Sequence, residues 1–203
     1  MESLNTVRSL LQPGGFKMKM GLKDAYYVVP IYPHHRKYLR FKFEGVTYEF
    51  QCLPFGLASA PRAFTKLLKY VVAVIRSKGI RIVIFLDDLL IMHQDREQCQ
   101  KIFHQVTNLL SNLGFLIKQE KCSSCPTQQI TFLGAFLNTI SMAIALPKEK
   151  MELIVQTSHQ MHSTHQCSLP ELSTLLGRMS HAAQTGVWTA PLRSITACFR
   201  GYT

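Results

Sequence analysis

The sequence predicts an α+β fold in which antiparallel hairpins pack against helices, followed by a smaller helical part. Up to about residue 146, stretches of alternating apolar and polar residues are interleaved with stretches of helical periodicity; beyond it, only helical periodicity continues. The length agrees, because 203 residues suit a main domain with a small appendage. We therefore expect a mixed body over residues 1–146 and a helical segment over 147–203.

The first predicted elements are a strand and a hairpin. Residues 22–31 are rich in side chains that favour strands. Residues 39–50 alternate apolar and polar side chains on both sides of a central Glu-Gly pair, which is a turn signal. This hairpin would carry Arg40 and Lys42 on its polar face.

Two helices flank the next predicted hairpin. Residues 58–79 predict a helix with Pro61 in its first turn, and residues 99–113 repeat apolar side chains at helical spacing. Between them, "RIVIFLDDLLIMH" predicts a strand, a tight turn and a second strand, with Asp87 and Asp88 at the turn.

The last part of the chain changes from strands to helices. Residues 130–147 predict a second hairpin that turns near Asn138-Thr139. Ser168 and Glu171 then form a capping-box pattern ahead of an apolar helical stripe.

The adjacent carboxylates of Asp87 and Asp88 require an explanation, because burying unpaired like charges is costly. At a hairpin tip facing a cleft they suit Mg²⁺, which prefers carboxylate oxygens and substrate phosphates. Paired metal ions about 3.5–4 Å apart serve phosphoryl transfer in polymerases and nucleases. The alternative is an acidic turn exposed to water, since Asp is common in turns.

The charge balance favours a polyanionic partner. Lys and Arg exceed Asp and Glu by 11, giving a pI near 9.6, so nucleic acid is the expected ligand. No apolar run approaches the roughly 20 residues that span a bilayer, so we expect no membrane partner. The N-terminus has no signal-peptide pattern, which predicts an intracellular protein, in the nucleus or the cytoplasm.

Five stretches occur in an order that resembles a reverse transcriptase palm. They are "LKDAYYVVPI", "LPFGLASAPRAFTK", "FLDDLLI", "LGFLIKQEKC" and "FLG". The stretches "LPFGLASAPRAFTK" and "LLGRMSHAAQTG" look most like retrotransposons of the DIRS, tyrosine-recombinase type. The resemblance implies a palm with a thumb-like C-terminal part that extends a primer on an RNA or DNA template from deoxynucleoside triphosphates, using two Mg²⁺ ions.

The resemblance also implies a role for each residue that matches a family motif. It assigns Asp87 and Asp88 to metal binding and catalysis, Tyr26 to checking the sugar of the nucleotide, Phe55 and Gly56 to the loop under nucleotide and template, Lys121 to the triphosphate, and Phe132, Leu133 and Gly134 to gripping the primer. The alternatives are strand packing for Tyr26, core packing for Phe55 and Phe132, and a solvated surface position for Lys121.

One position departs from the family pattern. The first motif normally reads Asp-Leu-Lys-Asp-Ala-Tyr, and its first Asp binds both metals, but Gly21 stands there. Asp24, three residues on, would face the opposite side of a strand. Because little sequence precedes this motif, we also expect the upstream fingers segment to be missing. We therefore expect impaired catalysis; the alternative is a non-catalytic nucleic-acid-binding remnant or a domesticated retroelement protein.

Two further candidates are less specific. Arg40 and Lys42 suit contacts to template phosphates, or they only solubilise a strand face. Cys122 and Cys125 have zinc-ligand spacing, but a single such pair is a weak signal, and the histidine-rich residues 159–167 lie in the helical segment. We expect Cys122 and Cys125 to pack near a hairpin and the histidines to lie on a helix surface, rather than a shared zinc site.

Overall fold

The computed structural model describes residues 2–164 and 167–185. Within these residues the chain forms two compact units, one built from residues 2–3 and 15–127 and the other from residues 4–14 and 128–185 without 165–166. Among the described helices, none is both long and apolar enough to cross a membrane.

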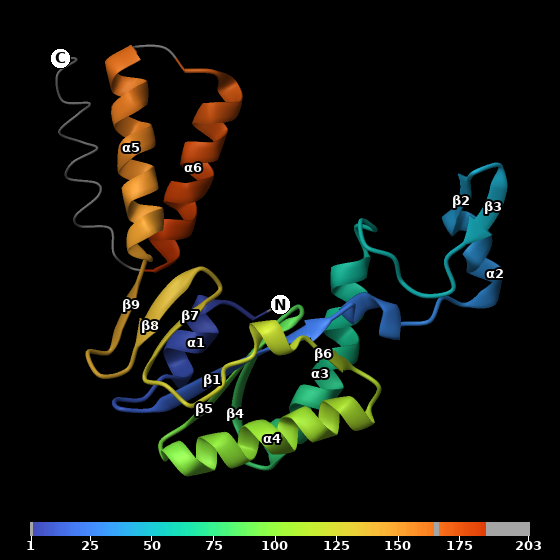
Figure 1. Ribbon diagram of the computed structural model, residues 1–203, viewed down its shortest axis with the longest axis horizontal. Coiled ribbons are helices and arrows are strands. Elements are labelled where there is room, and N and C mark those ends of the chain that lie inside the picture. Colours follow the sequence, from blue (N-terminus) through green and yellow to red (C-terminus); the bar gives the residue numbers. More distant parts are fainter. Residues whose placement is uncertain (1, 165–166, 186–203) are drawn as a thin grey trace. The chain divides into compact units, whose positions relative to one another are not determined.

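An antiparallel sheet forms the centre of the first unit. Its strands are, in spatial order, β4 (Arg81–Phe85), β5 (Asp88–His93), β1 (Phe16–Lys23) and β6 (Leu116–Ile117). Helices α3 (Ala60–Ser77) and α4 (Arg96–Asn112) pack on one face of this sheet (Figure 1). The mixed α+β architecture predicted from the sequence is confirmed.

The core of this unit lies between the sheet and the two helices. Along β1, Met18, Met20 and Leu22 point into the core, so Gly21 lies on the other face of the sheet. The remaining fully buried members come from the helices and from β4 and β5: Phe64, Leu68, Ile75, Cys99, Leu110, Ile82, Leu89 and Ile91.

The prediction of a strand over residues 22–31 is wrong. The strand is β1, which begins at Phe16, and a 3-10 helix, η1 (Ala25–Val28), follows it. Asp24 ends the strand with a left-handed backbone (φ 50°). The missed signal was the alternation of Lys with Met and Phe in "FKMKM", which is a strand pattern with one polar face.

The hairpin predicted over residues 39–50 is confirmed. Strands β2 (Arg40–Phe43) and β3 (Val46–Glu49) pair antiparallel, and every residue of both strands is exposed. Both turn residues, Glu44 and Gly45, have positive φ, as a two-residue hairpin turn of this kind requires. Helix α2 (Pro33–Arg36) and the 3-10 helix η2 (Lys37–Leu39) precede the hairpin.

The predicted strand, turn and strand around the aspartates are confirmed as β4 and β5. Phe85 pairs with Asp88 across the hairpin, so Leu86 and Asp87 form the turn. Both flanking helices are confirmed as well. Asp95 caps α4, because its side chain accepts a hydrogen bond from the backbone N–H of Gln98 at 2.8 Å.

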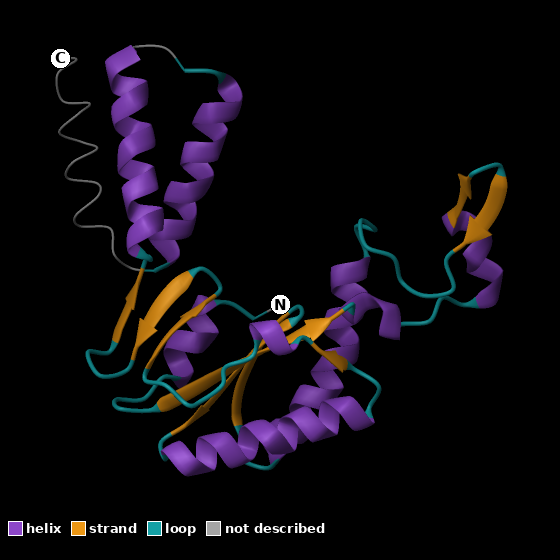
Figure 2. Ribbon diagram, in the orientation of Figure 1, coloured by secondary structure: helices purple, strands orange, loops and turns teal. Residues whose placement is uncertain are grey.

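The second unit combines a small sheet with helices (Figure 2). Strands β7 (Gln129–Phe132), β8 (Ala135–Asn138) and β9 (Ala143–Ala145) pair in that order, and the helices are α1 (Leu4–Leu10), α5 (Lys148–Thr164) and α6 (Leu169–Gln184). The predicted single hairpin over 130–147 misses the first turn, where Leu133 and Gly134 both have positive φ. The Ser168–Glu171 capping box is confirmed.

Candidate active site

The two adjacent carboxylates lie at the tip of the β4–β5 hairpin, beside the end of β1. The backbone N–H of Leu22 donates to the backbone carbonyl of Asp87 at 2.8 Å, and Gly21 is the direct cross-strand partner of Asp88. Leu86 adopts φ 54°, a conformation that costs a non-glycine residue roughly 1–2 kcal/mol. The hairpin turn therefore holds Asp87 and Asp88 in a defined position at the cost of local strain.

A lysine from a different element contacts both carboxylates. Lys121 ends the 3-10 helix η3 (Gln119–Lys121), and its Nζ donates to Asp87 Oδ2 at 2.9 Å and to Asp88 Oδ1 at 3.2 Å. The three side chains are each about 40% exposed, so the cluster is open to solvent on one side. The hydrogen bond to Asp87 is the main cause that raises the pKa of Lys121, which therefore stays protonated at neutral pH.

Gly21 leaves the space through which this lysine reaches the carboxylates. A Cβ atom added at position 21 would lie 2.6 Å from Cδ and 2.7 Å from Cβ of Lys121. Real Cβ atoms do not approach other carbon atoms that closely. The side chain of Lys121 therefore lies directly over Gly21 on the sheet face opposite the helices.

The backbone around Lys121 is fixed to β1 on both sides. The N–H of Lys118 donates to the carbonyl of Gly21 at 2.8 Å, and the N–H of Ser123 donates to the carbonyl of Lys19 at 2.9 Å. These bonds determine where the Cβ of Lys121 lies, so rotating its side chain cannot move that atom. Any L-residue at position 21 requires a backbone shift.

Two aromatic rings pack on Tyr26, whose side chain is close enough to Asp87 to feel its charge. The half-buried ring of Tyr26 lies 4.9 Å from the ring of Phe55 and 5.4 Å from that of Phe64. Burial is the main cause that raises the pKa of Tyr26, and the negative charge of Asp87 adds to it. Gly56, which follows the exposed Phe55, has φ 86°. Tyr26 therefore contacts Phe55 and lies within the electrostatic reach of Asp87.

The basic residues of the first hairpin lie on an exposed strand face. Arg40 donates to Glu49 across the hairpin at 3.0 Å, and both side chains are accessible to solvent. On the opposite face, Phe41 stacks on Tyr48 with ring centroids 5.6 Å apart. Arg40 and Lys42 are both accessible to an anionic ligand, although Arg40 already pairs with Glu49.

The three residues predicted to grip a primer belong to the second unit. Phe132 is buried, with 4% of its surface exposed, which agrees with the alternative interpretation of a core aromatic. Leu133 and Gly134 form the β7–β8 turn. The carbonyl of Gly134 lies 3.5 Å from Lys150 Nζ and 3.4 Å from His181 Nε2. This turn is held by side chains from α5 and α6.

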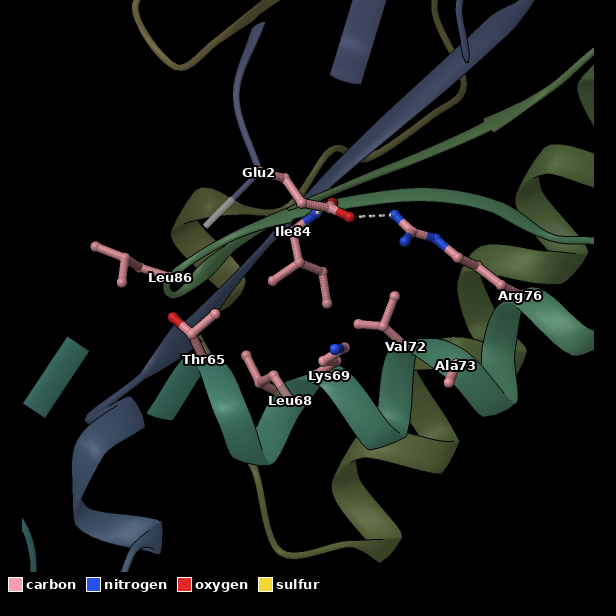
Figure 3. A pocket seen from close by; sticks show the side chains of 9 residues that line it. All are labelled: Glu2, Thr65, Leu68, Lys69, Val72, Ala73, Arg76, Ile84 and Leu86. Carbon is pink, nitrogen blue, oxygen red and sulfur yellow. Dashed lines mark hydrogen bonds and ion pairs between the residues drawn. The ribbon is translucent and has the colours of Figure 1, made fainter. Parts of the chain in front are cut away.

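A cavity lies beneath the hairpin, between α3 and β4 (Figure 3). It has a volume of about 480 Å³ and is lined mostly by apolar side chains, including that of Leu86. Arg76 Nη2 donates to Glu2 Oε1 at 2.6 Å, and the backbone N–H of Ile84 donates to Glu2 Oε2 at 2.7 Å. The Glu2 carboxylate thus accepts a hydrogen bond from a backbone N–H of β4, which is an edge strand of the sheet.

Taken together, an antiparallel sheet backed by two helices, with adjacent carboxylates on a tight hairpin, defines a polymerase palm. The family model "Reverse transcriptase (RNA-dependent DNA polymerase)" matches residues 9–137, well over half of the chain. The chain belongs to the reverse transcriptase family.

Curated relatives come from several kinds of retroelement. The chain is 29% identical over 135 residues to Protein P of duck hepatitis B virus, covering 65% of this chain and 17% of that protein. It is 30% identical over 131 residues to the Gag-Pol polyprotein of walleye dermal sarcoma virus, and 26% identical over 116 residues to the Tf2-3 transposon polyprotein of Schizosaccharomyces pombe. These matches cover 64% and 57% of this chain but 7% and 8% of the two polyproteins. The chain spans less than a fifth of each of these relatives.

Solved structures show the same fold. The foamy viral protease-reverse transcriptase in complex with an RNA/DNA hybrid aligns with a TM-score of 0.76 at 18% identity, covering 99% of this chain and 29% of that one. The same viral protein in complex with double-stranded DNA aligns with a TM-score of 0.74 at 19% identity, covering 99% and 37%.

Reverse transcriptases use divalent metal ions, but the residues at this hairpin do not fit a two-metal site. Within residues 2–164 and 167–185, no group of three or more His, Cys, Asp or Glu side chains could hold a metal ion. Asp24, the nearest acidic residue in sequence to Gly21, is exposed beyond the end of β1. The donor set is two carboxylates, and an ammonium group already contacts both.

The strand–turn–strand pattern and the order of the motifs located the aspartates, but nothing in the sequence indicated that Lys121 pairs with them. Asp87 and Lys121 are 34 residues apart and belong to different elements. Only the local path of η3 along β1 brings them together. The sequence showed that Gly21 lacks the expected carboxylate. The structure shows that this glycine also leaves room for the side chain of Lys121.

Proposed function

We propose that this chain is the palm portion of a retroelement reverse transcriptase that binds a primer–template hybrid and is impaired in nucleotide addition. In this proposal Asp87 and Asp88 correspond to the metal-binding carboxylates of the family. Tyr26, Phe55 and Gly56 form the surface that receives a deoxynucleoside triphosphate. The assignment to DIRS-type elements is part of the proposal and rests on the stretches "LPFGLASAPRAFTK" and "LLGRMSHAAQTG".

One observation carries the proposal: the carboxylate pair stands on the hairpin next to β1, and glycine is its cross-strand neighbour there. Opposite residues of an antiparallel pair place their Cβ atoms about 4.5–5.5 Å apart on one face. A carboxylate at position 21 would therefore lie beside Asp88. Because glycine stands at position 21, the oxygen ligand that the family pattern places beside Asp88 is missing.

Nucleic acid is the partner that the charge distribution favours. The chain carries an excess of 11 positive charges, and Arg40 and Lys42 are exposed on one strand face. The foamy viral proteins of the same fold are described in complex with an RNA/DNA hybrid and with double-stranded DNA. Binding through phosphate contacts needs no metal, so it would survive the loss of the third carboxylate.

Fluorescence anisotropy with a labelled RNA/DNA primer–template tests this function. We expect saturable binding that weakens steeply between about 50 and about 200 mM salt, because released counterions drive phosphate binding. A polyanion without base pairs, such as heparin, serves as the competitor that separates simple charge attraction from recognition of the duplex. Failure to bind the hybrid at low salt would refute the proposal.

A further inference from the structure

We infer that Lys121 is a built-in counter-ion that takes the place of the divalent metals at the carboxylate pair, and that Gly21 and Lys121 form one structural unit. This inference deepens the proposed function, because it assumes that Asp87 and Asp88 are the carboxylates that the family uses for metal binding. On this inference, glycine at position 21 removes a metal-binding carboxylate and also makes room for Lys121 to take the place of the metal ions.

Lys121 occupies the space that a side chain at position 21 would need. The stem of Lys121 fills the volume above position 21, with its Cβ, Cγ and Cδ all within 3.2 Å of where a Cβ at that position would lie. A side chain at 21 and a lysine at 121 exclude each other in this backbone arrangement. The glycine is therefore the condition that allows the lysine to reach the carboxylates.

The ammonium group of Lys121 compensates the charge of both carboxylates. The Nζ atom lies between the two carboxylates, within hydrogen-bond distance of one oxygen of each. An ammonium group has three donors and no lone pair, so it satisfies carboxylates but can never serve as a metal ligand. Mg²⁺ binds such oxygens at about 2.0–2.1 Å and requires near-octahedral geometry. A metal ion that binds Asp87 Oδ2 or Asp88 Oδ1 must therefore displace Lys121 from that oxygen.

The segment that carries Lys121 is anchored to β1. Hydrogen bonds on both sides of Lys121 fix this segment to β1, at the carbonyls of Gly21 and Lys19. The ammonium is therefore presented to the carboxylates at high local concentration, and a metal ion in solution competes against an intramolecular partner. Restoring Asp at position 21 alone would not rebuild the metal site, because the Cβ of Lys121 would still collide with it.

Manganese binding by the purified protein tests this inference, with electron paramagnetic resonance of free Mn²⁺ as the readout. We expect the wild-type chain to bind Mn²⁺ only weakly, and Lys121→Met to bind it at least tenfold more tightly. Adding Asp87→Asn to the Lys121→Met variant should abolish that gain. Lys118→Met is the matched control, since Lys118 contacts Glu120 at 3.8 Å and neither hairpin carboxylate.

Equal Mn²⁺ affinity in the wild type and in Lys121→Met would overturn the inference. Lys121→Gln provides a second, polar replacement of similar length if the methionine variant does not fold, and the same tenfold gain is expected. The inference would also be overturned if the wild-type chain bound Mn²⁺ tightly and Asp87→Asn alone abolished that binding, because the metal ion would then bind the carboxylates with Lys121 in place. None of these outcomes depends on nucleic acid, so a failure to bind the hybrid refutes the proposed function separately.

Discussion

At the scale of single residues, the candidate site depends on the lack of a side chain at Gly21, because Lys121 fills that space. Gly21 is buried under Lys121, and the hydrogen bonds of the neighbouring segment fix the position of the lysine Cβ. Spacing in the sequence predicted the carboxylates and the missing ligand. It could not predict the lysine contact, because that contact depends on how β1 and η3 pass each other in three dimensions.

Gly21→Ala should destabilise the protein by about 1–3 kcal/mol, because the added methyl group overpacks a site that cannot relax by side-chain rotation. Introducing Lys121→Gly into the same chain should recover part of the loss, whereas Lys121→Ala, which keeps the colliding Cβ, should recover less. Thermal unfolding measures all three.

Gly177→Ala is the matched control for this substitution. Gly177 lies within α6, and no atom lies within 4 Å of an added Cβ, so alanine there should raise stability by roughly 0.5–1 kcal/mol. An unchanged melting temperature for Gly21→Ala would contradict the close approach of Lys121.

Lys17 makes stability depend on pH. It is fully buried in β1, and burial lowers its pKa to about 8 from the ordinary value of 10.5. The unfolded chain therefore binds more protons than the folded chain between these two values, so stability should rise with pH through this window. Below about pH 8 the full cost of burying the charge applies.

Lys17→Met should raise stability near neutral pH by about 1–3 kcal/mol, and the advantage should vanish above about pH 10.5. Denaturant unfolding at several pH values measures this. A variant that is less stable than the wild type at neutral pH would show that the lysine contributes more through its contacts than its burial costs.

At the scale of elements, alternation and capping patterns predicted the structure best. The hairpin at Glu44-Gly45, the hairpin that carries the aspartates, and the capped α6 all have local signals that fix them. Strand β1 was misplaced because three of its polar positions are lysines, and the turn at Leu133-Gly134 was missed within an apolar run. The alternation in "FKMKM" was a readable strand signal for β1, whereas tertiary contacts decide where the apolar run turns at Leu133-Gly134.

The β2–β3 hairpin is the element expected to contact phosphates. Replacing both Arg40 and Lys42 by Ala should weaken binding of the hybrid and lower the slope of log K against log salt by about 2, one for each lost phosphate contact. Lys101→Ala, on the exposed surface of α4, is the control and should change the slope by less. If the slope of the double variant equals that of the wild type, Arg40 and Lys42 do not contact phosphates and serve only to keep the strand face soluble.

The capping box of α6 should contribute to the stability of the second unit. The Ser168 side chain accepts a hydrogen bond from the backbone N–H of Glu171, whose carboxylate accepts one from the N–H of Ser168 at 2.8 Å. Ser168→Ala should cost about 1 kcal/mol in thermal unfolding. Ser173→Ala, within the same helix, should cost less, and equal losses would argue against a specific capping contribution.

At the scale of the whole molecule, the fold and the chemistry point in different directions. The sheet, its helices and the carboxylate hairpin are those of a reverse transcriptase, and sequence motifs predicted them. The charge arrangement at the hairpin is instead that of an ion-pair cluster, with one ammonium shared by two carboxylates. We therefore expect the chain to retain nucleic-acid binding and to have lost efficient nucleotide addition.

Loss of nucleotide addition is tested by single-nucleotide primer extension with the wild-type chain, at protein concentrations that bind most of the hybrid and with either Mg²⁺ or Mn²⁺ present. We expect bound hybrid without extension above the protein-free background. Repeated extension of the primer by the wild-type protein, lost on Asp87→Asn, would contradict it, because Asp87 and Asp88 would then hold the metals despite Gly21 and Lys121.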